Sequence, residues 1–282
     1  MIAVIDIGSN SVRLMLWADG KTILKRLLTT RLGAGIQNRH LNQQSMLRSV
    51  EAVSYFFDEA KRAGAKEIYA CATAAVRSAE NREEFLRLVK DACGLSVDVV
   101  SGEREASLAA LGALGTGDGI VIDVGGASSE VVSVQKGERV YAVSFPVGAV
   151  TLRERCRDEA DRAEKLLDEI FAPLPGMQGK VFAVGGTATS LASLKLELKE
   201  YNAERIQNCY LTAGELHSLK QKLFSLTVEE RKVLAGMEAA RADVIAGGAA
   251  ILAKITDKMG AEGIYVSDRD NLEGYLYAQG IL

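Results

Sequence analysis

Histidine is scarce in this 282-residue chain, which contains only His40 and His217. A histidine-rich metal cluster therefore cannot be built, and any bound metal must be held by oxygen ligands, as magnesium is. The four cysteines lie far apart and form no Cys-x-x-Cys pair. We therefore expect free thiols, and neither a disulfide framework nor a zinc site.

Long apolar runs are also missing. No stretch of about 18 apolar residues could form a membrane-spanning helix. The opening apolar stretch, residues 2–5, is too short and lacks the basic flank of a signal peptide. These absences predict a cytoplasmic protein with no membrane partner. The net charge of −3 does not indicate a binder of nucleic-acid polymers, so a polyanionic substrate would have to be attracted by local arginine and lysine side chains.

The apolar content, 48% of the residues, is ample for one large domain or for two lobes of ordinary size. Short strand patterns alternate with helical patterns along the chain, which predicts the α/β class. The stretch Gly115-Thr116-Gly117-Asp118-Gly119 is the best candidate for a linker. We therefore predict an N-terminal lobe over residues 1–117 and a C-terminal lobe over residues 118–282.

A six-residue pattern occurs once in each predicted lobe. Asp6-x-Gly8-x-x-Ser11 and Asp123-x-Gly125-x-x-Ser128 follow the same kind of strand, which indicates two lobes of common design. In such a turn the glycine permits close backbone approach, amides and hydroxyls cradle phosphate oxygens, and the carboxylate holds magnesium directly or through water. A single turn could simply be an aspartate that caps a hairpin. Two equivalent turns would face each other across a cleft, with Asp6 and Asp123 on either side of a metal–phosphate complex.

Seven sequence blocks carry a resemblance to a known family. They are Asp6-Ile7-Gly8-Ser9-Asn10-Ser11-Val12-Arg13-Leu14, Ala72-Thr73-Ala74-Ala75-Val76-Arg77, Ser101-Gly102-Glu103-Arg104-Glu105-Ala106, Ile122-Asp123-Val124-Gly125-Gly126-Ala127-Ser128-Ser129-Glu130, Phe145-Pro146-Val147-Gly148-Ala149-Val150 and Gly185-Gly186-Thr187, followed by Val266-Ser267-Asp268 near the end. In this order they resemble the exopolyphosphatase/guanosine pentaphosphate phosphohydrolase (Ppx/GppA) family. The resemblance implies the two-lobed actin/sugar-kinase/heat-shock (ribonuclease H-like) fold with duplicated mixed-sheet domains, in a short form without the family's C-terminal histidine-aspartate type of domain.

The resemblance also implies a reaction. It is the hydrolysis of terminal phosphoanhydride bonds of inorganic polyphosphate, of guanosine pentaphosphate or of both, with Mg²⁺ or Mn²⁺ as cofactor. Two other functions stay open: a small-molecule kinase or ATPase of the same fold, in which Gly185-Gly186-Thr187 would contact an adenosine, and a non-catalytic sensor of guanosine polyphosphates. Retention of Asp6, Glu105, Asp123 and Glu130 speaks against the sensor. The oligomeric state also stays open, with a homodimer as one option.

Three residues receive catalytic roles through the resemblance. Glu105 is implied to position or deprotonate the attacking water, and a glutamate just inside a helix at the lobe junction is well placed for this. The alternative is a solvated glutamate favoured by the helix dipole. Glu130 is implied to be a metal ligand or water orienter, against the alternative of an exposed strand residue. Arg77 is implied to grip phosphate oxygens, against the alternative of a surface salt bridge.

The turns and the resemblance together predict the binding residues. Phosphate is expected at Gly8, Ser9, Asn10, Ser11, Arg13, Gly125, Gly126, Ala127, Ser128, Ser129, Gly185, Gly186 and Thr187, and the metal at Asp6, Asp123 and Glu130. Arg13 faces away from its apolar neighbours on the strand, so that it could reach phosphate or merely solvent. Arg231 resembles a family arginine that reaches substrate from the second lobe, although charged runs on helices usually form solvated faces.

Two departures from the family pattern accompany the resemblance. Ala127 stands where the family usually has a third glycine, which adds only a methyl group and leaves the loop functional unless φ is positive there. Asp270-Asn271-Leu272 stands where relatives often have Gly-Leu-Arg. The role of that missing arginine is therefore in doubt in this chain.

Overall fold

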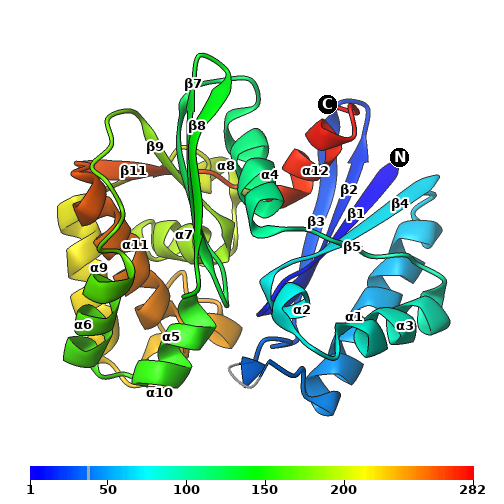
Figure 1. Ribbon diagram of the computed structural model, residues 1–282, viewed down its shortest axis with the longest axis horizontal. Helices are drawn as coiled ribbons and strands as arrows, with labels where there is room; N and C mark the ends of the chain where they lie inside the picture. The colour runs from blue at the N-terminus through cyan, green and yellow to red at the C-terminus, as the bar shows by residue number, and fades with distance from the viewer. Residues whose placement is uncertain (37–38) are drawn as a thin grey trace.

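The structure is a computed structural model that describes residues 1–36 and 39–282. Figure 1 shows two lobes, and each is built on one β-sheet. The first lobe contains β1 (Ile2–Ile7), β2 (Ser11–Ala18), β3 (Lys21–Thr29), α1 (Gln43–Arg62), β4 (Glu67–Ala72), α2 (Ala74–Ser78), α3 (Arg82–Cys93) and β5 (Asp98–Val99). Helix α4 (Gly102–Leu114) then leads to the second lobe.

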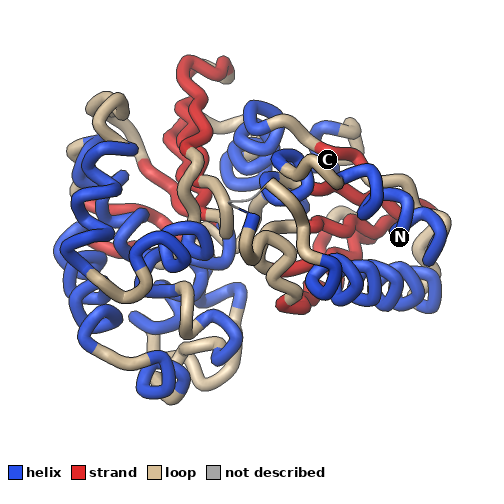
Figure 2. The backbone as a smooth tube through the Cα atoms, turned by 60° about the horizontal axis from the view of Figure 1, so that its bottom comes forward, coloured by secondary structure: helices blue, strands red, loops and turns tan. Residues whose placement is uncertain are grey.

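The second lobe carries the longer part of the chain. Its strands are β6 (Gly119–Val124), β7 (Ser129–Gln135), β8 (Glu138–Phe145), β9 (Val181–Val184), β10 (Tyr210–Thr212) and β11 (Gly263–Val266). Its helices are α5 (Ala149–Cys156), α6 (Ala160–Ile170), α7 (Gly185–Lys195), α8 (Ala203–Ile206), α9 (Ala213–Ser225), α10 (Val228–Lys232), a short 3₁₀ turn (Ala239–Arg241) and α11 (Ile245–Met259), and α12 (Asn271–Ala278) follows. Figure 2 shows helices around the strands of both lobes.

The two sheets are built on one plan. In the first sheet, β1 pairs with β2 antiparallel and with β4 parallel, and the strand order is β3-β2-β1-β4-β5. In the second, β6 pairs with β7 antiparallel and with β9 parallel, in the order β10-β11-β9-β6-β7-β8. Asp6 and Asp123 therefore occupy equivalent places, one residue before the end of a central strand. This duplication confirms the predicted mixed-sheet α/β class, while the lobe boundary at residue 117 stays a prediction.

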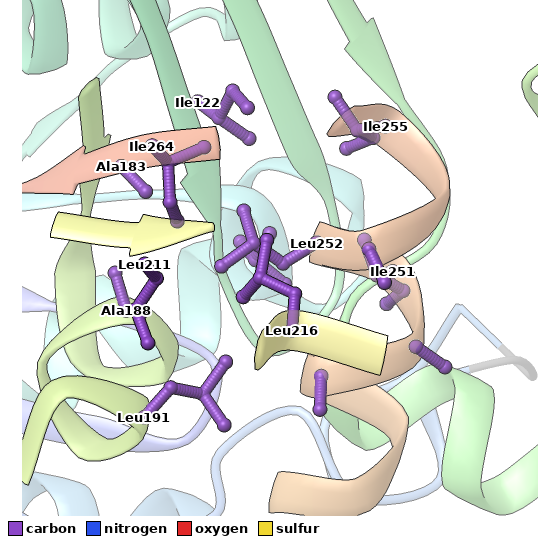
Figure 3. Close-up of a cluster of buried hydrophobic side chains, with 14 of the residues drawn as sticks. Ile122, Ala183, Ala188, Leu191, Leu211, Leu216, Ile251, Leu252, Ile255 and Ile264 are labelled. Atoms are coloured by element: carbon purple, nitrogen blue, oxygen red, sulfur yellow. The ribbon is translucent and has the colours of Figure 1, made fainter. Parts of the chain in front are cut away.

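The core of the second lobe lies between its sheet and its helices. Figure 3 shows Ile251, Leu252 and Ile255 of α11 close to Leu216 of α9 and Ile122 of β6. All five side chains are inaccessible to solvent. Because apolar burial contributes roughly 25 cal/mol per Å², this cluster holds β6 firmly, and β6 carries Asp123.

Helices α4 and α12 cross at unusually close range. A Cβ atom on Gly112 of α4 would lie 1.9 Å from the carbonyl oxygen of Asp270, and one on Gly274 of α12 would lie 1.9 Å from that of Leu108. Two glycines therefore permit this crossing. Leu272 and Leu276 of α12 also pack with residues of β1 and β2, so the last helix returns to the first lobe, where both chain ends lie in Figures 1 and 2.

The cysteines and the helices bear on two expectations from the sequence. All four cysteines are free thiols, as predicted. In the described residues, no helix is long and apolar enough to cross a membrane.

Candidate functional site

A cavity of about 80 Å³ lies between the lobes, where the β1–β2 and β6–β7 turns approach each other. The turns have the same backbone hydrogen bond, from Gly8 N to Ser11 O and from Gly125 N to Ser128 O, both at 3.0 Å. They also touch: a Cβ atom on Gly126 would lie 3.0 Å from the Cβ atom of Ser9. The repeated sequence pattern thus corresponds to two matched turns that face each other across the cavity.

Most of the residues predicted from the sequence come together around this cavity. Those that line it are Asp6, Gly8, Ser9, Asn10, Ser11, Arg13, Glu105, Asp123, Gly125, Gly126, Ala127, Ser128, Gly185, Gly186 and Thr187. Ser129 does not line it; this buried hydroxyl donates a hydrogen bond to Val147 O at 2.6 Å. Arg77 and Glu130 also lie outside the lining.

The N-terminal end of helix α5 packs against the β6–β7 turn. The amides of Ala149 and Val150 donate hydrogen bonds to the carbonyl oxygens of Gly125 and Gly126, both at 2.9 Å. Gly148 packs directly under this turn, because a Cβ atom there would lie 2.4 Å from the carbonyl carbon of Gly126. Ala127 has no positive φ, so the alanine at this position is accommodated without backbone strain.

Asp6 is held by an arginine from the neighbouring strand. Arg13 lies opposite Asp6 in the β1–β2 register, and its Nε donates to Asp6 Oδ2 at 3.0 Å. The other end of the guanidinium forms an ion pair with Asp270, the N-cap residue of α12. Arg13 therefore binds two carboxylates, one from each end of the chain, in addition to lining the cavity. The thiol of Cys71 lies 3.8 Å from the second oxygen of Asp6.

Asp123 is the least partnered carboxylate of the cavity. It is buried and forms no hydrogen bond or ion pair with any residue in the described part of the chain. Burial and the nearby charges of Glu130 and Glu105 raise its pKa well above the usual range. Gly185 lies against it: φ is +77° there, and a Cβ atom would lie 2.6 Å from Asp123 Oδ1. Only glycine satisfies both constraints.

Glu105 lies in the first turn of α4, whose N-cap is Ser101. Its side chain is buried, which rules out the solvated alternative. Arg77 Nη1 donates to Glu105 Oε2 at 2.6 Å and to Val100 O at 3.0 Å. Burial raises the pKa of Glu105; Arg77 opposes this rise, the charge of Asp6 adds to it, and the pKa stays above the ordinary value.

Arg77 was predicted to grip phosphate, but its guanidinium lies behind Glu105 and outside the cavity lining. The sequence motif places the residue at the end of α2, where the side chain reaches across to α4. The guanidinium of Arg77 therefore contacts Glu105, the residue predicted to act as the base. In this geometry Arg77 fixes one oxygen of the Glu105 carboxylate.

Glu130 lies on β7 directly opposite Asp123. It is 1% exposed, so it is not a solvated strand residue. Ser144 donates a hydrogen bond to its Oε1 at 2.6 Å, whereas its Oε2 is buried with no partner. Burial and then the charge of Glu105 raise the pKa of Glu130 to about 8.

This raised pKa predicts how stability depends on pH in metal-free buffer. Folded Glu130 keeps a proton up to about pH 8, whereas a glutamate in the unfolded chain loses it near its ordinary pKa of 4.5. The Glu130 contribution to stability is therefore present below pH 4.5 and is lost as pH rises through 8. Glu130→Gln should gain stability relative to wild type as pH rises from 5 to 8.5, in chemical unfolding with EDTA. Glu138→Gln, at an exposed position, is the control and should show no such gain. An equal gain in stability in Glu138→Gln, or a stability difference between Glu130→Gln and wild type that does not change with pH, would contradict this prediction.

The sequence left two options open for Arg231, a contact with substrate and a solvated helix face, and it shows neither. It is fully buried, where it donates hydrogen bonds to Leu223 O at 2.7 Å and Ala242 O at 3.3 Å and pairs with Asp158 at 3.2 Å. Helix α10 turns this side chain into the protein interior. Its role is to satisfy carbonyl groups between helices.

Arg241 lines the cavity instead, although no pattern in the sequence indicated it. Its guanidinium lies over Gly186, since a Cβ atom there would lie 2.1 Å from Nη1. Thr73 and Asn271 also line the cavity without having been predicted as site residues. Thr73 belongs to one of the quoted sequence blocks, but a 3₁₀ turn that carries Arg241 has no sequence signal of its own.

A second cavity of about 470 Å³ adjoins the first. Arg13, Gly185, Gly186 and Arg241 line both, so these four residues form the passage between them. Apolar parts of its wall come from Leu27, Leu198, Tyr201, Met237 and Leu272.

The donor set in the first cavity restricts the kind of metal that it could hold. Within residues 1–36 and 39–282, no group of three or more His, Cys, Asp or Glu side chains could hold a metal ion. Magnesium is commonly bound through one or two carboxylates together with substrate phosphates and water. Asp123 fits this mode from the cavity wall, and Asp6 fits it less well because Arg13 occupies its Oδ2. Glu130, opposite Asp123 on β7, lies outside the lining and offers one buried oxygen without a partner.

Comparison with known proteins gives consistent matches along the chain. Residues 4–280 match the model of the Ppx/GppA phosphatase family. Exopolyphosphatase 2 of Mycobacterium tuberculosis is 28% identical over 308 residues, which cover 97% of this chain and 96% of the relative. The crystal structure of a Ppx/GppA family member from Aquifex aeolicus has a TM-score of 0.82 at 29% identity, over 99% of this chain and 97% of that one. The crystal structure of an exopolyphosphatase-like protein has a TM-score of 0.91 at 25% identity, over 100% of this chain and 99% of that one. These structures confirm the predicted two-lobed fold.

Proposed function

We propose that this chain, which belongs to the Ppx/GppA phosphatase family and is a hydrolase acting on phosphoanhydride bonds, removes the terminal phosphoryl group of inorganic polyphosphate. The observation that carries the proposal is the pair of matched turns that meet across a cavity, with buried Glu105 in its wall. A cytoplasmic location and a homodimer stay predictions from the sequence.

The terminal phosphate would be held by the two turns. Their amides and the hydroxyls of Ser9, Ser11 and Ser128 are donors for phosphate oxygens, because backbone nests of this kind attract anions. Arg241 supplies a guanidinium at the passage between the two cavities, where it would contact the next phosphate. These residues bind and orient the bond to be cleaved.

Glu105 would align the attacking water and accept its proton. A carboxylate with a raised pKa is a stronger base than an ordinary glutamate, and it must be ionised to act. Arg77 holds Glu105 Oε2, and Thr73 also hydrogen-bonds this carboxyl, so its orientation toward the water would be fixed from two sides. Displacement at phosphorus depends mainly on positioning and charge, so this alignment is the principal task of the first lobe.

Ppx/GppA enzymes generally use a divalent metal ion, and we propose Mg²⁺ or Mn²⁺ held by Asp123 and Glu130, with Asp6 nearby. When bound, the ion would neutralise charge on the phosphoryl oxygens. The buried carboxylates support this proposal: burial raises the pKa values of Asp123 and Glu130, and repulsion from neighbouring carboxylates, Glu130 and Glu105 at Asp123 and Glu105 at Glu130, adds to the rise. A cation that displaces their protons would relieve that repulsion.

Guanosine pentaphosphate is a second candidate substrate, and the second cavity favours it. That cavity has room for a nucleoside and offers Leu198, Tyr201 and Met237 as apolar surface beside the passage. The same terminal phosphoryl group would then be cleaved in the first cavity.

Phosphate release by the purified protein tests the proposal. We expect release from tripolyphosphate, longer polyphosphate or guanosine pentaphosphate with Mg²⁺ or Mn²⁺, and its loss in EDTA. A phosphomonoester such as p-nitrophenyl phosphate is the control and should not be cleaved. Full activity after treatment with the chelator, or cleavage of the monoester alone, would refute the proposal.

A further inference from the structure

Two asparagine side chains in the wall of the first cavity have hydrogen-bonding capacity that the protein itself does not use. Asn10 lies in the β1–β2 turn, Asn271 is the first residue of α12, and both line the cavity. Both polar atoms of the Asn10 side chain are buried without a hydrogen-bond partner, and so is Oδ1 of Asn271. In the described part of the chain, no other Asn or Gln has a buried side-chain atom without a partner. The unused capacity of buried amides is therefore confined to this cavity.

Asn271 is the less expected of the two, because the sequence indicated only Asn10 as a phosphate ligand. Its side chain forms no hydrogen bond or ion pair with the residues that the structure describes, although the residue is only 4% exposed. A buried oxygen that has lost water and gained no donor destabilises the folded protein. An apolar side chain of similar size would avoid this penalty. The amide is therefore explained by a partner that enters the cavity, and not by packing.

The backbone on both sides of Asn271 is fixed. Asp270, the N-cap of α12, accepts a hydrogen bond from Leu272 N at 3.1 Å, and its own amide donates to Glu273 Oε2 at 3.1 Å. The Asp270 carboxylate also pairs with Arg13, another residue of the cavity wall. Helix α12 lies against α4 where the two lobes meet (Figure 1). The position of Asn271 is therefore set before a ligand binds, which lowers the entropy cost of binding.

The surroundings of Asn271 indicate that its partner is a phosphoryl group. The two matched turns offer amides and hydroxyls to the same cavity, and Arg241 lines it as well. The first turn of a helix carries a partial positive charge, which favours an anion. The nitrogen of an asparagine side chain has two N–H donors, whereas phosphoryl oxygens are acceptors. Because the amide is neutral, it can donate to phosphate without repelling a cation bound beside it.

We propose that Asn271 binds the terminal phosphoryl group by donating a hydrogen bond from Nδ2 to a phosphoryl oxygen. The inference deepens the proposed function and rests on it. Nδ2 is the end of the side chain available for this contact, since Oδ1 is the enclosed atom. Helix α12 thereby becomes a third element, beside the two turns, that holds the group to be cleaved.

Binding of inorganic phosphate, the product of the proposed reaction, tests this contact without turnover. Asn271→Leu replaces the amide by an apolar side chain of similar size. In buffer with Mg²⁺, the dissociation constant for phosphate should rise about tenfold to a hundredfold, as expected for loss of one hydrogen bond to a charged group. The melting temperature of the unliganded variant should equal or exceed that of wild type, because the variant lacks the unpartnered oxygen. Isothermal titration calorimetry and thermal unfolding measure the two quantities.

Gln43→Leu is the matched control. Gln43 is likewise the first residue of a helix, α1, but it is exposed and lies outside both cavity linings. It should bind phosphate as tightly as wild type. Asn271→Asp is the second variant, since it keeps the shape of the side chain but replaces its N–H donors by a charged oxygen that repels phosphate. It should bind phosphate more weakly than wild type.

Absence of phosphate binding in wild type, or wild-type affinity in either folded Asn271 variant, would overturn the inference. A loss of affinity in Asn271→Leu together with a lower melting temperature would also overturn it, because the amide would then support the fold and not the ligand. The proposed function fails by a different result. A protein that binds phosphate through Asn271 but releases none from any phosphoanhydride would contradict the proposed hydrolysis and leave this contact standing.

Discussion

Glu105→Gln should lower kcat by about two to four orders of magnitude, the usual range for loss of a positioned base. This corresponds to about 3–5 kcal/mol in the activation barrier. Glutamine has the same shape and can still accept a hydrogen bond from Arg77, so fold and substrate affinity should remain. In wild type, kcat should fall as pH falls through the raised pKa of Glu105, because only the ionised form accepts a proton. Steady-state kinetics over a range of pH measures both effects.

Glu103→Gln is the matched control for this prediction. Glu103 lies in the same first turn of α4 but is exposed and outside the cavity lining. It should keep wild-type kcat. If Glu105→Gln retained activity within a few-fold of wild type, the base would have to be sought elsewhere, with Glu130 as the nearest buried alternative.

Asp123→Asn should raise the metal concentration needed for half-maximal activity by about tenfold to a hundredfold. Replacement of a residue that only hydrogen-bonds a metal ligand already lowers metal affinity by about this factor. The reason is that Asp123 is buried beside the second turn and has no ion-pair partner in the described residues. Asp6→Asn should have a smaller effect on the metal requirement, since Arg13 already occupies one oxygen of Asp6.

Metal titrations of activity decide between these expectations. Asp91→Asn, at an exposed position on α3, provides a control with the same change in charge. Equal metal requirements in Asp123→Asn and wild type would exclude Asp123 as a ligand. A larger effect at Asp6 than at Asp123 would move the metal to the first turn.

The parts of the site that follow from local sequence were predictable. The repeated Asp-x-Gly-x-x-Ser pattern specifies a strand followed by a tight turn, and such a turn forms through contacts within a few residues, as the bonds from Gly8 to Ser11 and from Gly125 to Ser128 show. The duplication then predicted two similar lobes and a cleft between them. Glu105 was identified through the resemblance to the family, since its place at a helix start alone is equally typical of a solvated glutamate, and the structure places it in the cavity wall.

The arginines were less predictable, because a long side chain can reach in several directions from one backbone position. Arg77, Arg231 and Arg241 all lie on short helices or turns whose orientation depends on tertiary packing. Arg231 turned inward to satisfy carbonyl groups, Arg77 turned toward Glu105, and Arg241 entered the cavity. The pairing of Arg13 with Asp270 joins residues 257 positions apart, which no local pattern contains.

Hydrolysis of polyphosphate in water enriched in ¹⁸O tests the central claim most directly. If water held by Glu105 attacks the terminal phosphorus, each inorganic phosphate released should contain one oxygen from the solvent, and the shortened chain should contain none. Mass spectrometry of the released phosphate and of the remaining chain measures this. Label in the shortened chain would mean attack at the wrong phosphorus, and transfer of the phosphoryl group to an acceptor without labelled phosphate would mean a kinase rather than a hydrolase.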